Sequence, residues 1–235
     1  RGAEVVLEVP APLLRLLARM EGVAAVVAAG ESLPGFDLHC PMMSLPLGFG
    51  TTVETIPAAA PYLRAEPGPR PPGAGLRVGL VWAGGARPGE PRAFHADRRR
   101  SIPLAALAPL AAIQGVRLVS LQAGPPAAEA AGVAWVEDAM AGVRDFADTA
   151  AVVAGLELVI AVDTAVAHLA GGLGRPVWLL SRFDACWRWL ERREDSPWYP
   201  TMRIFRQGRP GDWADVIARV AAALRHASRR CRPAA

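Results

Sequence analysis

Three polar residues, Asp163, Thr164 and His168, stand where an apolar strand is expected to give way to a helix. The stretch "VIAVDTAVAHLAGGLGRPVWLL", residues 159–180, places them between two apolar runs. Ligands of open α/β sheets bind outside the carboxyl ends of the strands, where the first turn of the next helix presents free N–H groups. Thr164 and Ala165 would begin that turn, whose amides and partial positive charge suit a diphosphate. His168 lies four residues beyond Thr164 on the same helical face, so the pattern predicts one anion-binding site.

A purely structural interpretation of these residues stays open. Asp and Thr are ordinary helix caps, and a His on an apolar helix is often a hydrogen-bonded core residue. The Gly-rich "AGGLG" that follows is interpreted mainly as a helix stop signal.

The elements that must position these residues follow a regular pattern from residue 76 onward. Apolar strands alternate with helical stretches, which is typical of βαβ crossovers in a parallel sheet covered on both faces. We therefore predict a Rossmann-like, doubly wound domain over residues 76–228, with its last helix at 212–227. The predicted strands are 76–84, 116–122, 133–138, 156–163, 175–180 and 202–206.

Residues 1–55 predict a smaller, partial α/β domain on the N-terminal side. Residues 56–75 are so rich in Pro and Gly that we interpret them as an interdomain linker, and residues 229–235 as a basic tail. The elements expected in the partial domain are a strand at 4–9, a helix at 12–20 and a strand at 24–29.

Composition excludes several classes of protein. With 235 residues, 52% of them hydrophobic, the chain suffices for one large core or two modest ones. The net charge of +4 suits an anionic ligand, but the arginines are scattered and form no basic face with interleaved aromatics, so no nucleic-acid partner is expected. Three cysteines in no metal-like spacing indicate neither a disulfide framework nor a zinc site and favour a cytoplasmic location. No apolar run approaches the roughly 20 residues of a transmembrane helix.

Several ordered motifs resemble one enzyme family. "DTAVAHLAGGLGRPVWLL" is similar to the Asp-Thr-x-x-x-His-Leu-x-x-Ala-x-Gly-x-Pro stretch of glycosyltransferase family 9, the heptosyltransferase-like enzymes. "VGLVWAGG", "DRRRSIPL", "DFADTAAVVAGLELVIAVDTAVAHL" and "WRWLERREDSPWYPTMRIFRQ" look more specifically like the glycosyltransferase region of bacterial proteins that carry tetratricopeptide repeats upstream. The resemblance implies a GT-B architecture. In it, two Rossmann-like domains face a cleft, with the nucleotide sugar held mainly by the C-terminal domain and the acceptor by the N-terminal one. The N-terminal half is incomplete here, since "RGAEVVLEV" resembles that domain's second strand.

The resemblance also implies the main site residues. Motif matching assigns Asp163, Thr164, Ala165 and His168 to the donor diphosphate site. Arg100, just before "SIP", sits where these enzymes commonly carry a basic residue that reaches the phosphates. The planar, permanently charged guanidinium suits that role, and a solvated Arg in a run of three is the alternative.

Three further residues are weaker candidates. Gly84, with Gly85, would let a ligand or a neighbouring loop approach the backbone closely, and residues 84–97 are interpreted as a long Pro-rich loop. Gln122 and Asp148 are candidates to contact ribose or base, but each is also an ordinary strand-end or helix-start residue. The aromatics of "WRWL" and "SPWYPTMRIF" are interpreted as packing residues rather than a sugar platform.

The expected reaction is transfer of a sugar from a nucleoside diphosphate sugar to a hydroxyl of a glycan, lipid-linked or protein acceptor. The leaving diphosphate must be stabilised and the acceptor's proton removed. The sequence offers groups for the first need and no catalytic base for the second. No carboxylate pair has a metal-binding spacing, so neither a cofactor nor an obligatory metal is expected.

The alternatives to a glycosyltransferase are a catalytically silent nucleotide-sugar or partner-binding module, or a GT-B nucleotide-sugar epimerase. The chain starts at Arg1 and is expected to be part of a longer protein.

Overall fold

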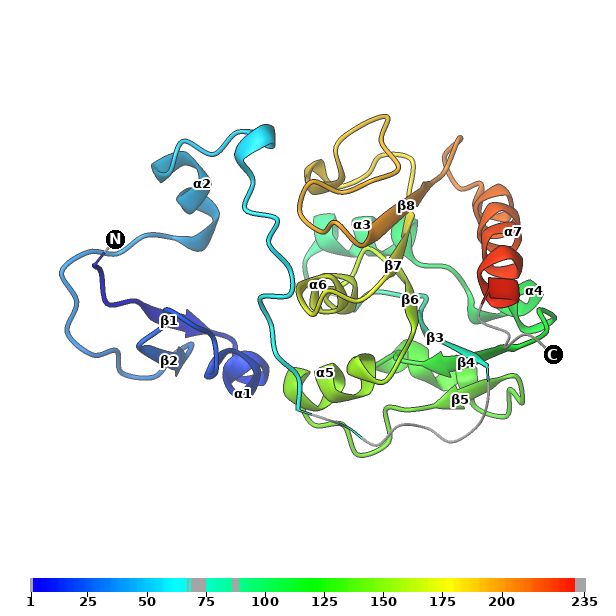
Figure 1. The fold of residues 1–235 in the computed structure, drawn as a ribbon, viewed down its shortest axis with the longest axis horizontal. Coiled ribbons are helices and arrows are strands. Elements are labelled where there is room, and N and C mark those ends of the chain that lie inside the picture. The colour runs from blue at the N-terminus through cyan, green and yellow to red at the C-terminus, as the bar shows by residue number, and fades with distance from the viewer. Residues whose placement is uncertain (1, 67, 69–74, 86–88, 231–235) are drawn as a thin grey trace.

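The computed structural model (Figure 1) describes residues 2–66, 68, 75–85 and 89–230. Its larger part is built on one parallel sheet of six strands in the order β5-β4-β3-β6-β7-β8. The chain begins in the middle, runs outward to β5, returns beside β3 and runs outward to β8, which is the doubly wound Rossmann order. The predicted fold class is thereby confirmed. The strands are β3 (Leu76–Val81), β4 (Val116–Ser120), β5 (Val136–Asp138), β6 (Leu158–Val162), β7 (Val177–Ser181) and β8 (Met202–Arg206).

Helices cover both faces of this sheet (Figure 1). On one face α4 (Ala108–Ala111) and α7 (Trp213–Arg230) pack into one hydrophobic cluster. On the other face α5 (Phe146–Ala154) and α6 (Ala165–Gly172) pack into a second cluster. Two apolar layers demand strands that are apolar on both sides, which is why the sequence shows near-continuous hydrophobic runs.

The side chains of β6 alternate between the two layers. Ile160 and Val162 belong to the cluster under α4 and α7, whereas Val159 and Ala161 belong to the cluster under α5 and α6. All four are at most 1% exposed, so β6 is the buried centre of the domain. The site residues that follow β6 are consequently fixed to the most rigid part of the molecule.

Several boundaries differ from the sequence prediction. The predicted loop at 84–97 was wrong in its second half, because Pro91–Arg100 forms helix α3. Pro at the first helical position has no N–H group of its own to be left unbonded, and this start signal explains the helix. The last helix, α7, continues through Arg230, so the basic tail predicted from residue 229 begins inside it. Residues 231–235 lie outside the described residues.

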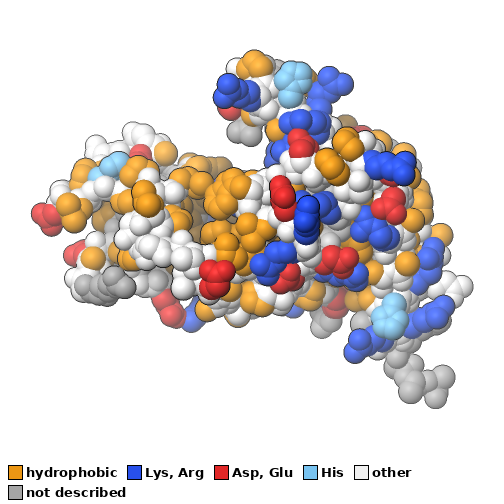
Figure 2. Space-filling view, turned by 90° about the horizontal axis from the view of Figure 1, so that it is seen from above, with side chains coloured by type: hydrophobic (Ala, Val, Ile, Leu, Met, Phe, Trp, Pro, Cys, Tyr) orange, Lys and Arg blue, Asp and Glu red, His pale blue; other side chains and the backbone are white. Residues whose placement is uncertain are grey.

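The N-terminal segment, residues 2–55, is much thinner. Its strands β1 (Val6–Val9) and β2 (Ala25–Ala28) form a two-stranded parallel sheet. The predicted helix at 12–20 is only a short helix, α1 (Leu14–Leu17), preceded by a 3-10 turn, and α2 (Leu45–Gly48) follows. Figure 2 shows apolar side chains gathered on this side of the molecule. Large exposed apolar side chains of the segment are Val5, Leu33, Phe36, Leu38, Met42, Met43, Leu45, Leu47, Phe49 and Val53.

The described part of the predicted linker, residues 56–66, runs beside α6. The amides of Tyr62 and Leu63 both donate to the carbonyl of Gly172, at N–O distances of 3.0 Å. The side chain of Leu63 packs against the cluster under α5 and α6. This segment is therefore attached to the Rossmann-like domain through the end of α6. The remaining 3-10 turns of the chain are Met42–Ser44, Val53–Thr55, Leu104–Leu107, Pro125–Ala130 and Trp187–Trp189.

Candidate functional site

Most of the predicted site residues lie at the carboxyl edge of the sheet, between β3 and β6. These two strands are neighbours, but β3 leads to β4 on one side and β6 leads to β7 on the other. In doubly wound sheets, ligands bind in the crevice that such a reversal leaves at the carboxyl ends of the two strands. Residues 82–84 follow β3 there, and residues 163–165 follow β6.

Thr164 is the residue from which α6 begins. Its backbone is extended (φ −138°, ψ 167°), and its carbonyl accepts from the amide of Ala167 at 3.1 Å. The hydroxyl donates to the carbonyl of Val162 at 3.2 Å and makes no side-chain cap. The side chain of Thr164 therefore caps none of the N–H groups at the start of α6. These N–H groups point outward from the end of the helix, and Ala165 in this first turn is exposed. A hydroxyl bond from Thr164 to a ligand requires rotation away from Val162.

Arg100 spans the crevice from the end of α3. Its Nε and Nη2 donate to Oδ1 of Asp97 at 3.1 and 2.9 Å, and its Nη1 donates to the carbonyl of Asp163 at 2.7 Å. A guanidinium has five N–H donors, so two remain after these three bonds. The side chain is 22% exposed and its partner Asp97 only 9%. Arg100 is thus a fixed cation with donors to spare beside the start of α6, and not a solvated Arg in a loop.

Gly84 makes room for this pair. A Cβ on Gly84 would overlap Oδ1 of Asp97 and Nη2 of Arg100. The amide of Gly84 donates to the hydroxyl of Ser101 at 3.2 Å. The close approach expected at Gly84 is therefore made by neighbouring side chains, and Gly84 contributes by positioning Arg100. Asp97 was not predicted as a site residue, although it lies three residues before Arg100 on one helix.

His168 faces the same place from the next turn of α6. Its Nε2 is 3.9 Å from Oδ1 of Asp163, and its side chain is 34% exposed. The ring stacks on Trp189 with centroids 5.1 Å apart, and Trp189 is fully buried. Burial lowers the pKa of His168 below 6.5, with Asp163 acting in the opposite direction and Arg188 adding to the lowering. The imidazole is therefore neutral near pH 7 and has one N–H to donate.

Tyr199 completes the surroundings of His168. Its hydroxyl lies 2.9 Å from Nδ1 of His168, and the two rings meet edge to face. Tyr199 and Trp189 both come from the aromatic segments interpreted as packing residues, and both are buried as that interpretation expects. They also hold the histidine, a role for which the sequence carried no signal beyond the gathering of aromatics.

Gln122 does not reach the crevice as a free group. Its Oε1 accepts from the amides of Trp82 and Ala83 at 3.0 and 2.9 Å, and its Nε2 donates to the carbonyls of Ala83 and Ala123, both at 3.0 Å. These four bonds use the full capacity of the amide, and the residue is 3% exposed. Of the two interpretations of Gln122, these bonds favour the strand-end one: the residue ties the end of β3 to the end of β4.

Asp148 is likewise engaged within the protein. It accepts from Arg144, which precedes α5, and from Arg15 on α1, at 2.8 and 2.9 Å. These bonds hold the pKa of Asp148 well below its usual range. Arg15 also binds Asp145, the N-cap of α5, at 2.8 Å. Of the two interpretations of Asp148, these bonds favour the structural one, a helix-start residue, here with an ionic tie between the N-terminal segment and the Rossmann-like domain.

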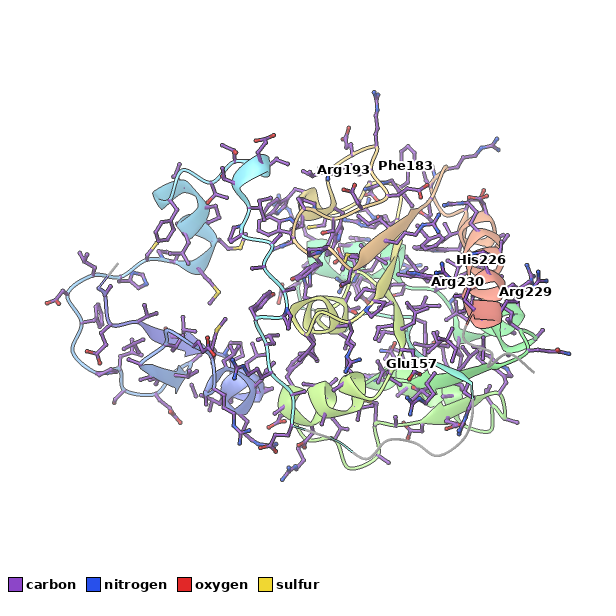
Figure 3. All side chains as sticks on the ribbon, viewed as in Figure 1. Glu157, Phe183, Arg193, His226, Arg229 and Arg230 are labelled. Atoms are coloured by element: carbon purple, nitrogen blue, oxygen red, sulfur yellow. The ribbon has the colours of Figure 1, made fainter. Side chains whose placement is uncertain are left out.

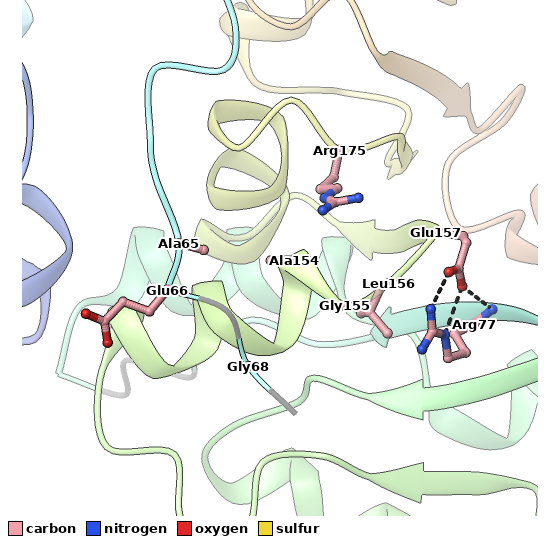
Figure 4. Close-up of a pocket in the computed structure, with 9 residues that line it drawn as sticks. All are labelled: Ala65, Glu66, Gly68, Arg77, Ala154, Gly155, Leu156, Glu157 and Arg175. Carbon is pink, nitrogen blue, oxygen red and sulfur yellow. Dashed lines mark hydrogen bonds and ion pairs between the residues drawn. The ribbon is translucent and has the colours of Figure 1, made fainter. Parts of the chain in front are cut away.

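The opposite, amino edge of the sheet holds a cavity of about 420 Å³ (Figure 4). Arg77 and Glu157 lie in its wall and bind one another, with Nε of Arg77 3.0 Å from Oε2 of Glu157. Figure 3 shows a separate basic group, His226, Arg229 and Arg230, at the end of α7. Neither of these features belongs to the crevice between β3 and β6.

Two further searches concern metals and membranes. Within the described ranges, no group of three or more His, Cys, Asp or Glu side chains is arranged to hold a metal ion. Among the same residues, no helix has both the length and the apolar character that crossing a bilayer requires.

Comparison with known proteins gives one relative by sequence. No protein-family model matches the chain. Protein FlbA of Caulobacter vibrioides is 34% identical over 161 residues, which make up 65% of this chain and 26% of FlbA. The chain thus spans only 26% of the length of this curated relative.

Solved structures resemble the chain more extensively. Escherichia coli ADP-heptose LPS heptosyltransferase II matches with a TM-score of 0.55 at 15% identity, over 96% of this chain and 91% of that one. E. coli heptosyltransferase WaaC with ADP gives a TM-score of 0.43 at 19% identity, over 69% of this chain and 46% of WaaC. The likeness to heptosyltransferase II shows the fold, an α/β, GT-B-like architecture with a Rossmann-like parallel sheet.

Proposed function

We propose that this chain carries the donor-binding region of a glycosyltransferase. The enzyme would transfer a sugar from a nucleoside diphosphate sugar to an acceptor hydroxyl. The observation that carries the proposal is Arg100, held across the crevice by Asp97 and the Asp163 carbonyl with two N–H donors left. It lies beside the first turn of α6, whose amides favour an anion.

The chemistry follows from where charge develops. As the bond between the sugar and the diphosphate breaks, negative charge grows on the leaving diphosphate. Arg100, the α6 amides and the neutral N–H of His168 are donors fixed before the reaction, so they stabilise that charge without reorganising. We propose that they act without a cofactor or an obligatory metal. The new bond forms to the acceptor oxygen, whose proton passes to a base that we do not assign to any residue.

The proposal extends to the setting of the enzyme. It includes a glycan, lipid-linked or protein acceptor, tetratricopeptide repeats elsewhere in a bacterial protein and a cytoplasmic location. The sequence resemblance supports these parts. The likeness of the fold to an ADP-heptose LPS heptosyltransferase supports the reaction class, since that neighbour is a glycosyltransferase by name.

Thermal unfolding of the chain with UDP, GDP, ADP and CMP tests the proposal. A nucleotide at about 100 times its dissociation constant stabilises by about 2.7 kcal/mol, a rise in Tm on the order of 5 to 10 °C. Arg100→Lys keeps the charge but loses the fork, so an affinity about tenfold weaker should roughly halve the rise. Arg98→Lys is the matched control, because Arg98 is exposed on the same helix and should leave the rise unchanged.

The outcomes separate the candidate functions. A rise with one nucleotide, reduced in Arg100→Lys and in His168→Ala, supports the donor site and names its base. Binding without turnover of the corresponding nucleotide sugar points to the silent module. No rise with any nucleotide from a cooperatively folded chain contradicts the proposal.

A further inference from the structure

Tyr199 contacts His168 and lies near Tyr62 of the segment 56–66. The hydroxyl of Tyr199 is 2.9 Å from Nδ1 of His168. Burial raises the pKa of Tyr199 well above its usual value, and Tyr62 adds to the rise. The Tyr199 hydroxyl therefore keeps its proton across the physiological range and has it available for Nδ1.

Two adjacent glycines of α6 make this arrangement possible. A Cβ on Gly171 would lie 2.5 Å from Cδ1 of the Tyr199 ring. A Cβ on Gly172 would lie 2.7 Å from Cδ1 of Leu63 and 3.0 Å from Cζ of Tyr62. Both tyrosines thus lie against bare backbone on α6. The pair "GG" in "AGGLG", interpreted as a stop signal, is a packing surface within the helix, and Gly174 (φ +68°) follows the helix end.

The direction of the hydrogen bonds follows from the charge on the far side of the imidazole. The ring is neutral near pH 7, so one nitrogen carries the proton and the other a lone pair. Nε2 faces Oδ1 of Asp163 at 3.9 Å. A lone pair facing a carboxylate is repelled, whereas an N–H facing it is attracted. The proton is therefore placed on Nε2, which leaves Nδ1 as the acceptor from Tyr199.

We propose that Tyr199 is a positioning residue that presents His168 to the ligand as an Nε2–H donor, by donating its own proton to Nδ1. The inference rests on the proposed function, because the donated N–H is useful only to an anionic ligand at Asp163 and α6. Arg188 and Asp163 are the charged groups that act on His168, and Tyr199 is the neutral hydroxyl bonded to it.

The tautomer of His168 is measured first, on the full chain without ligand. ¹⁵N NMR of histidine-labelled protein, with His168→Gln to assign the signal, should show the proton on Nε2 at pH 7.5. A proton on Nδ1 in the wild type contradicts the proposal that Tyr199 donates to Nδ1. This measurement needs no altered tyrosine and does not depend on any nucleotide.

Tyr199→Phe then removes one hydroxyl and keeps the ring. We expect mixed tautomers of His168 and an affinity for the best-binding nucleoside diphosphate roughly threefold to tenfold weaker. Tyr62→Phe leaves the bond between Tyr199 and His168 intact, so it is the matched control and should change neither the tautomer nor the affinity. Unchanged tautomer and affinity in Tyr199→Phe overturn the inference alone. A wild-type chain that binds no nucleotide overturns the proposed function, and with it the ligand-facing role of His168.

Discussion

The two edges of the six-stranded sheet each hold an arginine, and the two arginines are used differently. At the amino edge, Arg77 is 3% exposed and pairs side by side with Glu157. At the carboxyl edge, Arg100 is 22% exposed and binds one carboxylate and one carbonyl, with two N–H donors remaining. Both residues have the same charge and the same donor geometry.

The difference shows how the same residue type can be fully used by the fold or be left with bonding capacity. A buried cation needs a full set of partners, because an unpaired charge inside a protein is strongly destabilising. Arg77 receives a carboxylate of its own. Arg100 binds Asp97 beside the backbone of Gly84, at the edge where helix α6 begins. An incompletely bonded cation at such an edge is suited to the anionic ligand that we propose.

The largest expected effect belongs to the amino edge. Glu157→Ala leaves the Arg77 guanidinium buried without its carboxylate and should lower the free energy of unfolding by about 3 kcal/mol. Urea unfolding measures this loss in the free energy of unfolding. The rise in Tm that a nucleotide causes should be the same in Glu157→Ala as in the wild type. The control is Glu137→Ala, which cuts the more exposed pair with Arg117 and should cost much less. Equal losses of free energy of unfolding in Glu157→Ala and Glu137→Ala would contradict the expectation that the buried ion pair matters more to stability than the exposed one.

The next effect lies on α6, beside the carboxyl edge. Gly171→Ala places a methyl group 2.5 Å from the Tyr199 ring, and overpacking of this kind costs about 1–3 kcal/mol. The same variant should weaken nucleotide binding, since Tyr199 must move away from His168. Gly48→Ala, in helix α2 with open space around it, is the control and should change neither quantity. A Gly171→Ala chain as stable as the wild type would show that α6 and Tyr199 are loosely packed.

A smaller effect concerns pH. Burial lowers the pKa of His168, so the unfolded chain takes up a proton near pH 6.5 while the folded chain does so only at lower pH. The unfolded state then binds more protons, and the free energy of unfolding should fall as the pH drops from 7.5 through 6.5 toward the folded-state pKa. His168→Gln should make this part of the pH dependence disappear. If the difference in the free energy of unfolding between the wild type and His168→Gln does not depend on pH, the pKa of His168 is the same in the folded and unfolded chain.

The smallest effect is expected at the ionic tie to the N-terminal segment. Arg15→Gln removes its bonds to Asp145 and Asp148, which are partly exposed and open to screening by salt. Hydrogen exchange of the β1 and β2 amides should become faster, while nucleotide affinity stays the same. Raising the salt concentration should accelerate hydrogen exchange of these amides in the wild type and should change their exchange rate less in Arg15→Gln. Exchange that is equal in both at low salt would show that the segment 56–66 alone holds the N-terminal segment in place.

The sequence predicted the strands of the six-stranded sheet better than it predicted helix α3 and the N-terminal helix. The apolar runs that include Val159 and Ala161 are buried on both faces, and such runs leave little choice but a parallel strand between two helical layers. Helix α3, which begins at Pro91, was missed because the sequence of residues 84–91 is dominated by Gly and Pro, which usually signal a loop. The N-terminal helix came out shorter than its pattern suggested, because a thin segment offers it little apolar surface to pack against.

The sequence alone determined which residues stand at strand ends. Asp163 follows the most apolar strand, and Thr164 and His168 follow at helical spacing, so their common location is a consequence of strand and helix periodicity. Only the tertiary structure decided which of the polar residues have bonding capacity left. Gln122 meets partners 39 and 40 residues away in the chain, Asp148 meets one 133 residues away, and both are saturated, whereas Arg100 meets partners that leave it two donors. Hydrogen-bond saturation depends on neighbours brought together by the fold, and no local pattern of residues encodes it.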